Sequence, residues 1–597
     1  MKQLLNRKSL ISIRSHYHVY LYSVLVGVLA GFASVGFTRI LFRVEGFVQS
    51  LHHKSSVENK TLLDHYHDVF NFPILSLLIV LLPAFGGLLA GYIRKKYINK
   101  YGGAGTDNLI RAFHKKEGQI DSRSPVFNAI GTIFTIGSGG SGGKEGPIAQ
   151  IGAAIGVFIA NIIKVGARAR RTLLLAGMAA GLGAVFKSPL GGALTAVEMV
   201  YKEDIESDAL IPCFIASVTA YLTMTVFDGN EPFMQFGTVQ FLHFNEIFFY
   251  LILGVLCFWF GFIFIRTFRI IRNRIERYPV NLSLKAALGG LAVGIISLFF
   301  YQTASQGIVF LEACFKGFQP SLFNNNTVLS IAGTFVLIAF IKILTTSITL
   351  GSGGLGGIFG PSLFVGGALG AAVGTIAMYF IPGSVHIGSY IIVGMGAFYA
   401  GIANAPIAGI IMVCEMTGSY VLLPPLILVS IFTFILSKKV SYYRHQVQNR
   451  FKSPAHYYDM RFDIIDSISV KNAMEEMRSL ACVQQSSSML DVRKFAASIQ
   501  ASDLVAINDS NEYAGILSLK ELDLGEWSNE ELSANVKPYL KSNVPALSIH
   551  NSLADAMKVI MEYDIDKVAV VSDSKFKGYI GVKDIFSFYH KAIGKKV

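Results

Sequence analysis

The sequence predicts an α-helical, multi-pass membrane protein with an internal repeat and broken, re-entrant helices, followed by a small α/β region. Three observations lead to this fold class. Hydrophobic residues make up 52% of the 597 residues and charged residues only 15%, whereas soluble domains carry about a quarter charged residues. Glycine-rich sequence interrupts the apolar half at two related places. After Ser437 the composition becomes that of an ordinary soluble domain.

The apolar runs separate clean membrane spans from broken ones. About 20 apolar residues cross the hydrocarbon core of a bilayer. Runs that reach or approach this length lie at 20–42, 72–93, 210–227, 247–265, 286–300, 328–343 and 420–436. Shorter apolar pieces broken by glycine and proline fill 126–200 and 344–417. Broken helices at membrane depth are tolerated only where they pack inside protein or line a cavity, so we expect the functional site there.

Charge and cysteine usage exclude several classes of function. The net charge of +13 suits Lys and Arg collected in cytoplasmic loops, and no nucleic-acid-binding module accompanies it. Residues 1–18 form a basic arm without the apolar core of a signal peptide. We therefore expect cytoplasmic N- and C-termini in a plasma or inner membrane. The five cysteines are scattered and indicate neither a disulfide framework nor a metal site.

The apolar half uses one unit twice. GSGGSGGKEGP at 137–147 and GSGGLGGIFGP at 351–361 are identical at eight of eleven positions, with an offset of 351 − 137 = 214. SPLGGALTAVEM at 188–199 resembles APIAGIIMVCEM at 405–416 at a nearly equal offset. Transporters built from such repeats place their site at the interface between the two copies.

The soluble region repeats as well. DLVAINDSNEYAGILSLKEL at 503–522 resembles DKVAVVSDSKFKGYIGVKDI at 566–585, and each copy predicts strand, turn, strand and helix start. The expected domains are an N-terminal arm at 1–18, a membrane domain at 19–450 with repeats at about 73–227 and 283–437, a linker at 451–467, and modules at 468–523 and 535–592.

Each glycine-rich loop ends in a proline, Pro147 or Pro361, that suits the first turn of a new helix. The free N–H groups and positive dipole end of such a helix attract anions. Two such helix starts would hold an anion without a full positive charge, so the ion could leave again. Close helix packing through glycine is the alternative. The first loop is not a nucleotide site, because it departs from the P-loop pattern at Ser138 and Glu145.

Acidic residues are scarce in the broken regions. Between 122 and 201 only Glu145 and Glu198 are acidic. Glu198 and Glu415 are repeat equivalents, which favours a paired structural role near helix ends. Glu145 has Phe359 as its repeat partner instead. A membrane-embedded carboxylate without a symmetry mate is a functional candidate, and an ionised Glu145 would occupy the site of the anion itself.

These motifs resemble the CLC family of chloride channels and chloride/proton exchangers. GKEGP at 143–147 is similar to the GREGP motif of that family, GIFGP at 357–361 to GIFAP, and SYYRHQ at 441–446 to the end of the last membrane helix. The resemblance implies inverted repeats, a homodimer and one pore in each subunit. It also implies that Glu145 is the gating glutamate and that Gly146, Ile358, Phe359 and Tyr443 contact the anion.

Two sites depart from the family pattern. In GGAGTD, Ala104 replaces the pore serine of the GSGIP motif, which removes one hydroxyl donor to the anion, and Asp107 replaces the proline. The internal proton-transfer glutamate of the exchangers falls on Met199. A thioether carries no proton and is a weak acceptor, so Met199 argues against strong proton coupling.

The tandem modules resemble CBS domains. GILSLKEL at 515–522 and GYIGVKDI at 578–585 are similar to the ribose-contacting pattern of these domains, which implies an adenine-nucleotide site with Ser518, Glu521 and Asp584. Gly581 stands where that pattern has Ser or Thr. A degenerate pair that only braces the dimer is the alternative.

The sequence thus predicts a membrane pathway for small inorganic anions, chloride foremost, rather than an enzyme. Channel-like or weakly coupled conduction is favoured, and a chloride/proton antiporter is the alternative. No cofactor is required, apart from the candidate adenine nucleotide. A CBS-linked divalent-cation channel is a rival from another class, but its path needs carboxylates or carbonyls, whereas these repeats offer N–H groups and few acids.

Overall fold

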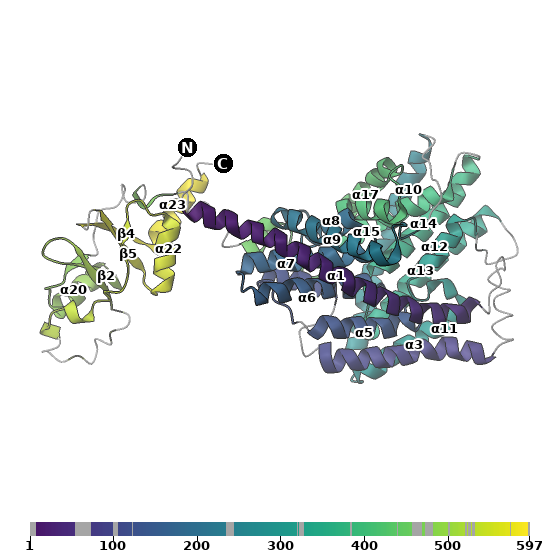
Figure 1. Ribbon diagram of the computed structural model, residues 1–597, viewed down its shortest axis with the longest axis horizontal. Helices are drawn as coiled ribbons and strands as arrows, with labels where there is room; N and C mark the ends of the chain where they lie inside the picture. The colour runs from purple at the N-terminus through teal and green to yellow at the C-terminus, as the bar shows by residue number, and fades with distance from the viewer. Residues whose placement is uncertain are drawn as a thin grey trace. The chain divides into compact units, whose positions relative to one another are not determined.

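The computed structural model describes residues 7–53, 73–98, 105–121, 123–234, 244–318, 320, 327–382, 385–438, 440–456, 468–471, 482–499, 502–519, 522, 527, 532–572 and 575–594. The chain divides into two compact units, Met1–Ala455 and His456–Val597. Figure 1 shows the first unit as helical and the second as mixed α/β.

The first unit consists of long apolar helices interleaved with short ones. Its α-helices are α1 (Arg7–His53), α3 (Pro73–Ile93), α4 (Thr106–Lys115), α5 (Arg123–Gly137), α6 (Glu145–Ile162), α7 (Ala167–Val185), α8 (Pro189–Glu198), α9 (Leu210–Asp228), α10 (Glu246–Arg277), α11 (Leu282–Phe299), α12 (Ile308–Phe315), α13 (Val328–Ser352), α14 (Phe359–Phe380), α15 (Ile387–Ala403), α16 (Pro406–Thr417) and α17 (Leu423–Ser437). The single turns are η1 (Arg94–Ile98), η3 (Ser207–Ala209), η4 (Tyr301–Thr303), η5 (Arg450–Lys452) and η6 (Pro454–His456).

Eight helices in the described part of the chain are long and apolar enough to cross a membrane. Others are too short to cross alone: α8 has 10 residues and α16 has 12. Most residues of both short helices are buried, and both helices lie in the regions 126–200 and 344–417, where the sequence predicts broken helices. The multi-pass helical fold with re-entrant pieces is thereby confirmed.

The predicted repeat is visible in the order of the helices. α3, α5, α6, α7, α8 and α9 correspond in order to α11, α13, α14, α15, α16 and α17. The two copies meet where α3 packs on α11, side by side in Figure 1, and where α8 packs on α16. Between them the glycine loops form an antiparallel bridge, in which Gly143 and Gly357 exchange two backbone hydrogen bonds of 2.8 and 2.7 Å. This reciprocal pairing places a pseudo-two-fold axis between the two loops.

The paired carboxylates lie on the same repeat interface. Glu415 at the end of α16 accepts hydrogen bonds from the N–H groups of Leu190 and Gly191 at the start of α8, at 3.2 and 2.8 Å. Glu198 at the end of α8 accepts in return from the N–H groups at the start of α16, at 3.2 and 2.7 Å. Each carboxylate thus satisfies otherwise unpaired donors of the opposite repeat. This is the structural role that the sequence favours for both residues.

The second unit contains two small sheets of the same topology. Each has three strands, with the first pair parallel and the second antiparallel. The elements are β1 (Cys482–Gln484), α20 (Met489–Ile499), β2 (Asp503–Ile507), β3 (Tyr513–Ser518), η7 (Lys537–Tyr539), β4 (Leu547–Ser548), α22 (Leu553–Glu562), β5 (Lys567–Ser572), β6 (Lys575–Gly581) and α23 (Val582–Gly594). The equal strand order is what the repeat at 503–522 and 566–585 predicts.

Candidate anion pathway

Glu145 lies where the two glycine loops meet. It is the first residue of α6, and its side chain is only 6% exposed. Its Oε1 accepts a hydrogen bond of 2.5 Å from the backbone N–H of Phe359, the first residue of α14. The carboxylate of one repeat therefore rests on the N-terminal helix end of the other, where partial positive charge favours an anion.

Glycine residues leave the space that the Glu145 carboxylate occupies. A Cβ atom added to Gly143 or Gly357 would collide with the carboxylate oxygens of Glu145. Gly360 borders the same space, since a Cβ there would lie 4.0 Å from Oε2. We call the pocket formed by Gly143, Gly357, Phe359 and Gly360 the glycine cradle. Its backbone donors and small size suit a single anionic group, and in this structure that group is the Glu145 carboxylate.

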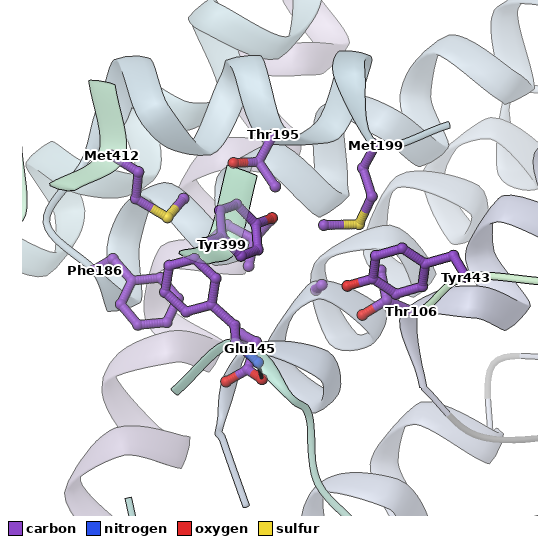
Figure 2. Close-up of a pocket in the computed structure, with 11 residues that line it drawn as sticks. Thr106, Glu145, Phe186, Thr195, Met199, Tyr399, Met412 and Tyr443 are labelled. Carbon is purple, nitrogen blue, oxygen red and sulfur yellow. Dashed lines mark hydrogen bonds between the residues drawn. The ribbon is translucent and has the colours of Figure 1, made fainter. Parts of the chain in front are cut away.

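A small cavity adjoins the cradle. Its volume is about 10 Å³, roughly the minimum that holds one water-sized particle. Figure 2 shows Glu145 on one side of the cavity, Thr195 of α8 and Met199 directly after that helix on another, and Tyr443 beside Thr106. The residues that line it are Thr106, Glu145, Ala149, Leu182, Phe186, Thr195, Met199, Phe359, Tyr399, Met412 and Tyr443.

The structure brings most of the sequence-predicted pore residues together. Glu145, Phe359, Tyr443 and the proton-path position Met199 all line the cavity. Ile358, directly before α14, lines the adjoining cleft. Gly146 packs against the opposite glycine loop, where an added Cβ would lie 3.4 Å from the Cα of Gly357. Ala104 lies outside the described residues.

A wider cleft opens on the side of Tyr443 and Thr106, which line both spaces. Its volume is about 520 Å³. Cationic side chains dominate its lining over the carboxylates Asp107, Glu145 and Glu276; they are Arg94, Arg111, Arg269, Arg272, Lys285 and Arg444. A concave surface with this excess of positive charge concentrates small anions near its floor.

Asp107, which replaces the proline of the family motif, has a structural partner in this cleft. It accepts hydrogen bonds from the backbone N–H of His445 at 3.0 Å and from His445 Nδ1 at 2.7 Å. These bonds tie the start of α4 to the segment that carries Tyr443. Asp107 therefore holds two parts of the cleft lining together, the start of α4 and the segment around Tyr443.

Lys144, the residue directly before Glu145, is fully buried. Its Nζ lies 4.3 Å from the ring centre of Phe233, 4.5 Å from Phe42 and 5.7 Å from Phe186, and has no hydrogen-bond partner among the described residues. Aromatic faces stabilise an ammonium group without pairing it to an anion. Beyond Phe42 and Phe233 lies a second pocket of about 520 Å³, whose charged lining residues are Arg39, Arg43, Lys187 and Asp228.

Three cavity residues are not marked by sequence reasoning. Thr106 lies in GGAGTD and Thr195 in SPLGGALTAVEM, but nothing in either segment singles them out, and Tyr399 lies in no motif. Gln446 donates its Nε2 to the carbonyls of Met199, Tyr201 and Ala403 at 2.8, 3.2 and 2.9 Å.

Just after the C-terminal end of α8, the carbonyl of Val200 accepts a hydrogen bond of 2.8 Å from His114 Nε2. Its Nδ1 lies 2.7 Å from Ser453 Oγ. The two partners of His114 lie 86 and 339 residues away in the chain, so no local pattern marks this histidine.

The candidate nucleotide residues have internal partners. Ser518 donates to Asp503 at 2.6 Å, and Asp584 accepts from the N–H of Gly581 at 2.9 Å. Glu521 lies outside the described residues. Among the described residues of the whole chain, no group of three or more His, Cys, Asp or Glu side chains could hold a metal ion.

Comparisons with known proteins agree with this geometry. The family model of the voltage gated chloride channels matches residues 86–438, and the CBS domain model matches 536–591. A putative chloride channel protein, ClcB-like, from Ralstonia nicotianae is 29% identical over 361 residues, which cover 60% of this chain and 81% of that protein.

Solved structures share the fold at low identity. A slow cyanobacterial Cl⁻/H⁺ antiporter has a TM-score of 0.60 at 21% identity, covering 70% of this chain and 94% of its own. A CLC-type fluoride/proton antiporter has a TM-score of 0.59 at 23% identity, with 72% and 98% covered. A eukaryotic CLC transporter has a TM-score of 0.57 at 16% identity, with 96% and 98% covered. Since the family model spans more than half of the 597 residues, this multi-pass membrane protein belongs to the voltage gated chloride channel (CLC) family and carries a C-terminal CBS domain.

Proposed function

We propose that this chain conducts chloride and similar small anions through the glycine cradle, with Glu145 as the gate. The observation that carries the proposal is the carboxylate of Glu145 on the N–H of Phe359, in a pocket that a single Cβ would fill. An ionised Glu145 competes with the anion for these donors. Protonation removes its charge and weakens its hold on the helix terminus, so an anion can replace it.

The proposed path uses both spaces around the cradle. An anion enters the basic cleft, passes Thr106 and Tyr443 into the small cavity, and reaches the cradle when Glu145 leaves. It then passes the aromatic surroundings of Lys144 toward the pocket of Arg39 and Lys187. The cradle itself offers backbone dipoles rather than a paired cation, which supports rapid release of the ion.

We favour weak or absent proton coupling. Among the described residues that line the cavity, Glu145 is the one carboxylate, and Met199 occupies the position toward α8 where a proton would have to continue. Water between polar groups can also carry protons, so a chloride/proton antiporter is the alternative. Four threonine and tyrosine residues that line the cavity carry hydroxyl groups and favour that alternative; they are Thr106, Thr195, Tyr399 and Tyr443.

Basic residues support cytoplasmic placement of the exit from the membrane domain. Arg168, Arg170 and Arg171 begin α7, and Arg171 donates to the carbonyl of Ala455 at 3.0 Å. The start of α7 and the end of the membrane unit therefore lie on the same side. Positively charged loops stay cytoplasmic, so we propose cytoplasmic termini, together with a homodimeric state in a plasma or inner membrane.

A divalent-cation pathway is disfavoured by the same site. Hard cations take oxygen ligands, whereas the cradle presents N–H groups and the adjoining cleft presents six Arg and Lys side chains.

Adenine-nucleotide binding at the CBS modules is a second proposal. CBS domains can bind such nucleotides. Because Ser518 and Asp584 are engaged internally, binding here requires exchange of those hydrogen bonds, and bracing of the dimer is the alternative role.

The test is chloride efflux from proteoliposomes that hold the purified protein, with pH and magnesium varied. The proposal predicts a chloride flux that rises as pH falls and does not change with the magnesium concentration. Efflux no faster than from protein-free vesicles refutes it. Reversal potentials in a chloride gradient then separate a channel, which reverses at the chloride potential at any pH difference, from an antiporter, whose reversal moves with the pH gradient.

A further inference from the structure

A second buried carboxylate lies close to the gate. Glu45 is on α1, only 4% exposed, and its Oε2 accepts a hydrogen bond of 2.8 Å from Gln306 Nε2. The buried cations that act on it are Lys144 and Lys342. Buried charges are expensive unless they are compensated, so such a cluster needs a reason. The pathway described above makes no use of Glu45.

Lys342 and Gln306 connect this carboxylate to the glycine loop that precedes the gate. Lys342 Nζ donates to the carbonyls of Thr303 and Ser305 at 2.9 and 2.8 Å. Ser305 in turn donates from its backbone N–H to the carbonyl of Gly139 at 3.2 Å and from its hydroxyl to Ile136 at 2.9 Å. The segment from Thr303 to Gln306 thereby joins Glu45 and Lys342 to the loop that leads into Lys144 and Glu145.

The backbone of α1 also lies directly against this loop. A Cβ added to Gly137 would meet the side chain of Val44 and lie 4.0 Å from the backbone nitrogen of Glu45. A Cβ on Gly139 would lie 3.7 Å from Val48. Glu45 is almost fully buried against this loop, so its charge acts through a low-dielectric interior.

The charges of the cluster balance only while the gate is closed. Two carboxylates, Glu45 and Glu145, and two ammonium groups, Lys144 and Lys342, are all buried, and Glu45 acts on both ammonium groups. Asp228 also acts on Lys144, but it is partly exposed and is paired with Arg39 at 3.2 Å. When Glu145 is neutralised or leaves the cradle, one positive charge is left uncompensated. A monovalent anion in the cradle restores the balance. Without Glu45, two uncompensated ammonium groups would hold that anion more strongly.

We infer that Glu45 is a fixed counter-charge that weakens anion binding in the cradle and so speeds release of the ion. The inference rests on the proposed function, because it takes the cradle as the anion site and Glu145 as the group that the anion replaces. Glu45 is a positioning and tuning residue that does not touch the ion. A purely structural Glu45 would instead change folding stability and leave anion affinity unaltered.

The test is chloride calorimetry on the purified full chain in a Glu145→Gln background, which keeps the gate neutral. Glu45→Gln retains an acceptor for Gln306 and removes one charge. A buried unit charge at an effective dielectric constant of about 20 shifts affinity by about fivefold to fiftyfold over separations typical of one cluster. We expect chloride to bind that much more tightly and flux at saturating chloride to fall.

Opposite and matched variants separate charge from damage. Lys342→Gln removes one positive charge from the cluster, keeps an N–H donor for the carbonyls of Thr303 and Ser305, and should weaken chloride binding, so that the two variants give opposite shifts that general destabilisation cannot produce. Glu246→Gln removes another buried carboxylate, on α10, and should leave affinity within about twofold.

The outcomes divide cleanly. Chloride affinity that is unchanged or weakened in Glu45→Gln overturns the inference while the anion site stands. If Glu45→Gln does not fold, an unchanged affinity in Lys342→Gln overturns the inference instead, because the net charge of the cluster would then have no effect on the anion. Absence of chloride binding in the Glu145→Gln parent refutes the proposed function itself.

Discussion

Neutralising the gate gives the sharpest prediction. Glu145→Gln keeps the size of the side chain but replaces a charge-assisted hydrogen bond from Phe359, 2.5 Å long, by a neutral one. Hydrogen bonds to charged groups contribute about 1.5–3 kcal/mol, against about 1 kcal/mol for neutral ones. A loss of about 0.5–2 kcal/mol lowers the ratio of closed to open gate by about twofold to thirtyfold.

The sign of the pH dependence follows from the same contact. In the proposed mechanism the ionised carboxylate closes the cradle, so wild-type chloride flux should rise as pH falls and protons bind Glu145. The amide side chain of Glu145→Gln does not titrate at pH values where a carboxylate does. The variant should therefore conduct at neutral pH as the wild type does in acid, with a nearly flat profile.

The assay is chloride efflux from proteoliposomes followed with a chloride electrode between about pH 4.5 and pH 8, a range that brackets ordinary carboxyl titration. Glu246→Gln is the matched control, because it removes a buried carboxylate on α10 that does not line the cavity or the cleft. It should keep the wild-type profile. A Glu145→Gln protein that retains the full pH dependence would show that the gate is elsewhere.

Three further predictions address coupling, the repeat interface and the CBS modules. Met199→Glu places a titratable group in the cavity next to the gate and should make the reversal potential move with an imposed pH gradient; a reversal fixed at the chloride potential would count against the proton-path assignment. Glu415→Gln should lower the free energy of unfolding by about 1–3 kcal/mol, seen as a reduced melting temperature, because the two helix-start N–H donors and Ser188 lose a charged acceptor; an unchanged melting temperature would contradict that role. Asp584→Ala should weaken binding of adenine nucleotides to the purified full chain by calorimetry, whereas no heat from ATP, ADP or AMP with the wild-type protein would favour dimer bracing.

The parts predictable from sequence are those that local chemistry enforces. Two glycine loops followed by helix-starting prolines predict two helix termini that face each other, and the bridge between Gly143 and Gly357 shows them doing so. Glu198 and Glu415 can be matched from the sequence because they occupy equivalent positions in the two repeats. That each one caps the opposite repeat depends on how α8 packs on α16, which no single segment encodes.

The parts that sequence reasoning missed depend on partners distant in the chain. Glu45 and Gln306 are 261 residues apart, and each alone is an unremarkable polar residue beside apolar sequence. Hydropathy likewise marks only the membrane-crossing part of α10, at 247–265. The helix continues to Arg277, and this basic extension contributes Arg269 and Arg272 to the cleft. Apolar runs reveal where the chain meets lipid, and they say little about polar surfaces that helices present to one another.

The most direct test of the account is to locate an anion in the cradle. Crystals of the Glu145→Gln variant grown in bromide should show anomalous scattering from one bromide ion at the position that the Glu145 carboxylate holds in this structure. That ion should lie within hydrogen-bonding distance of the backbone N–H of Phe359, between the two glycine loops. Bromide bound only in the basic cleft or the outer pocket, with the cradle unoccupied, would contradict the claim that the gate and the anion share one site.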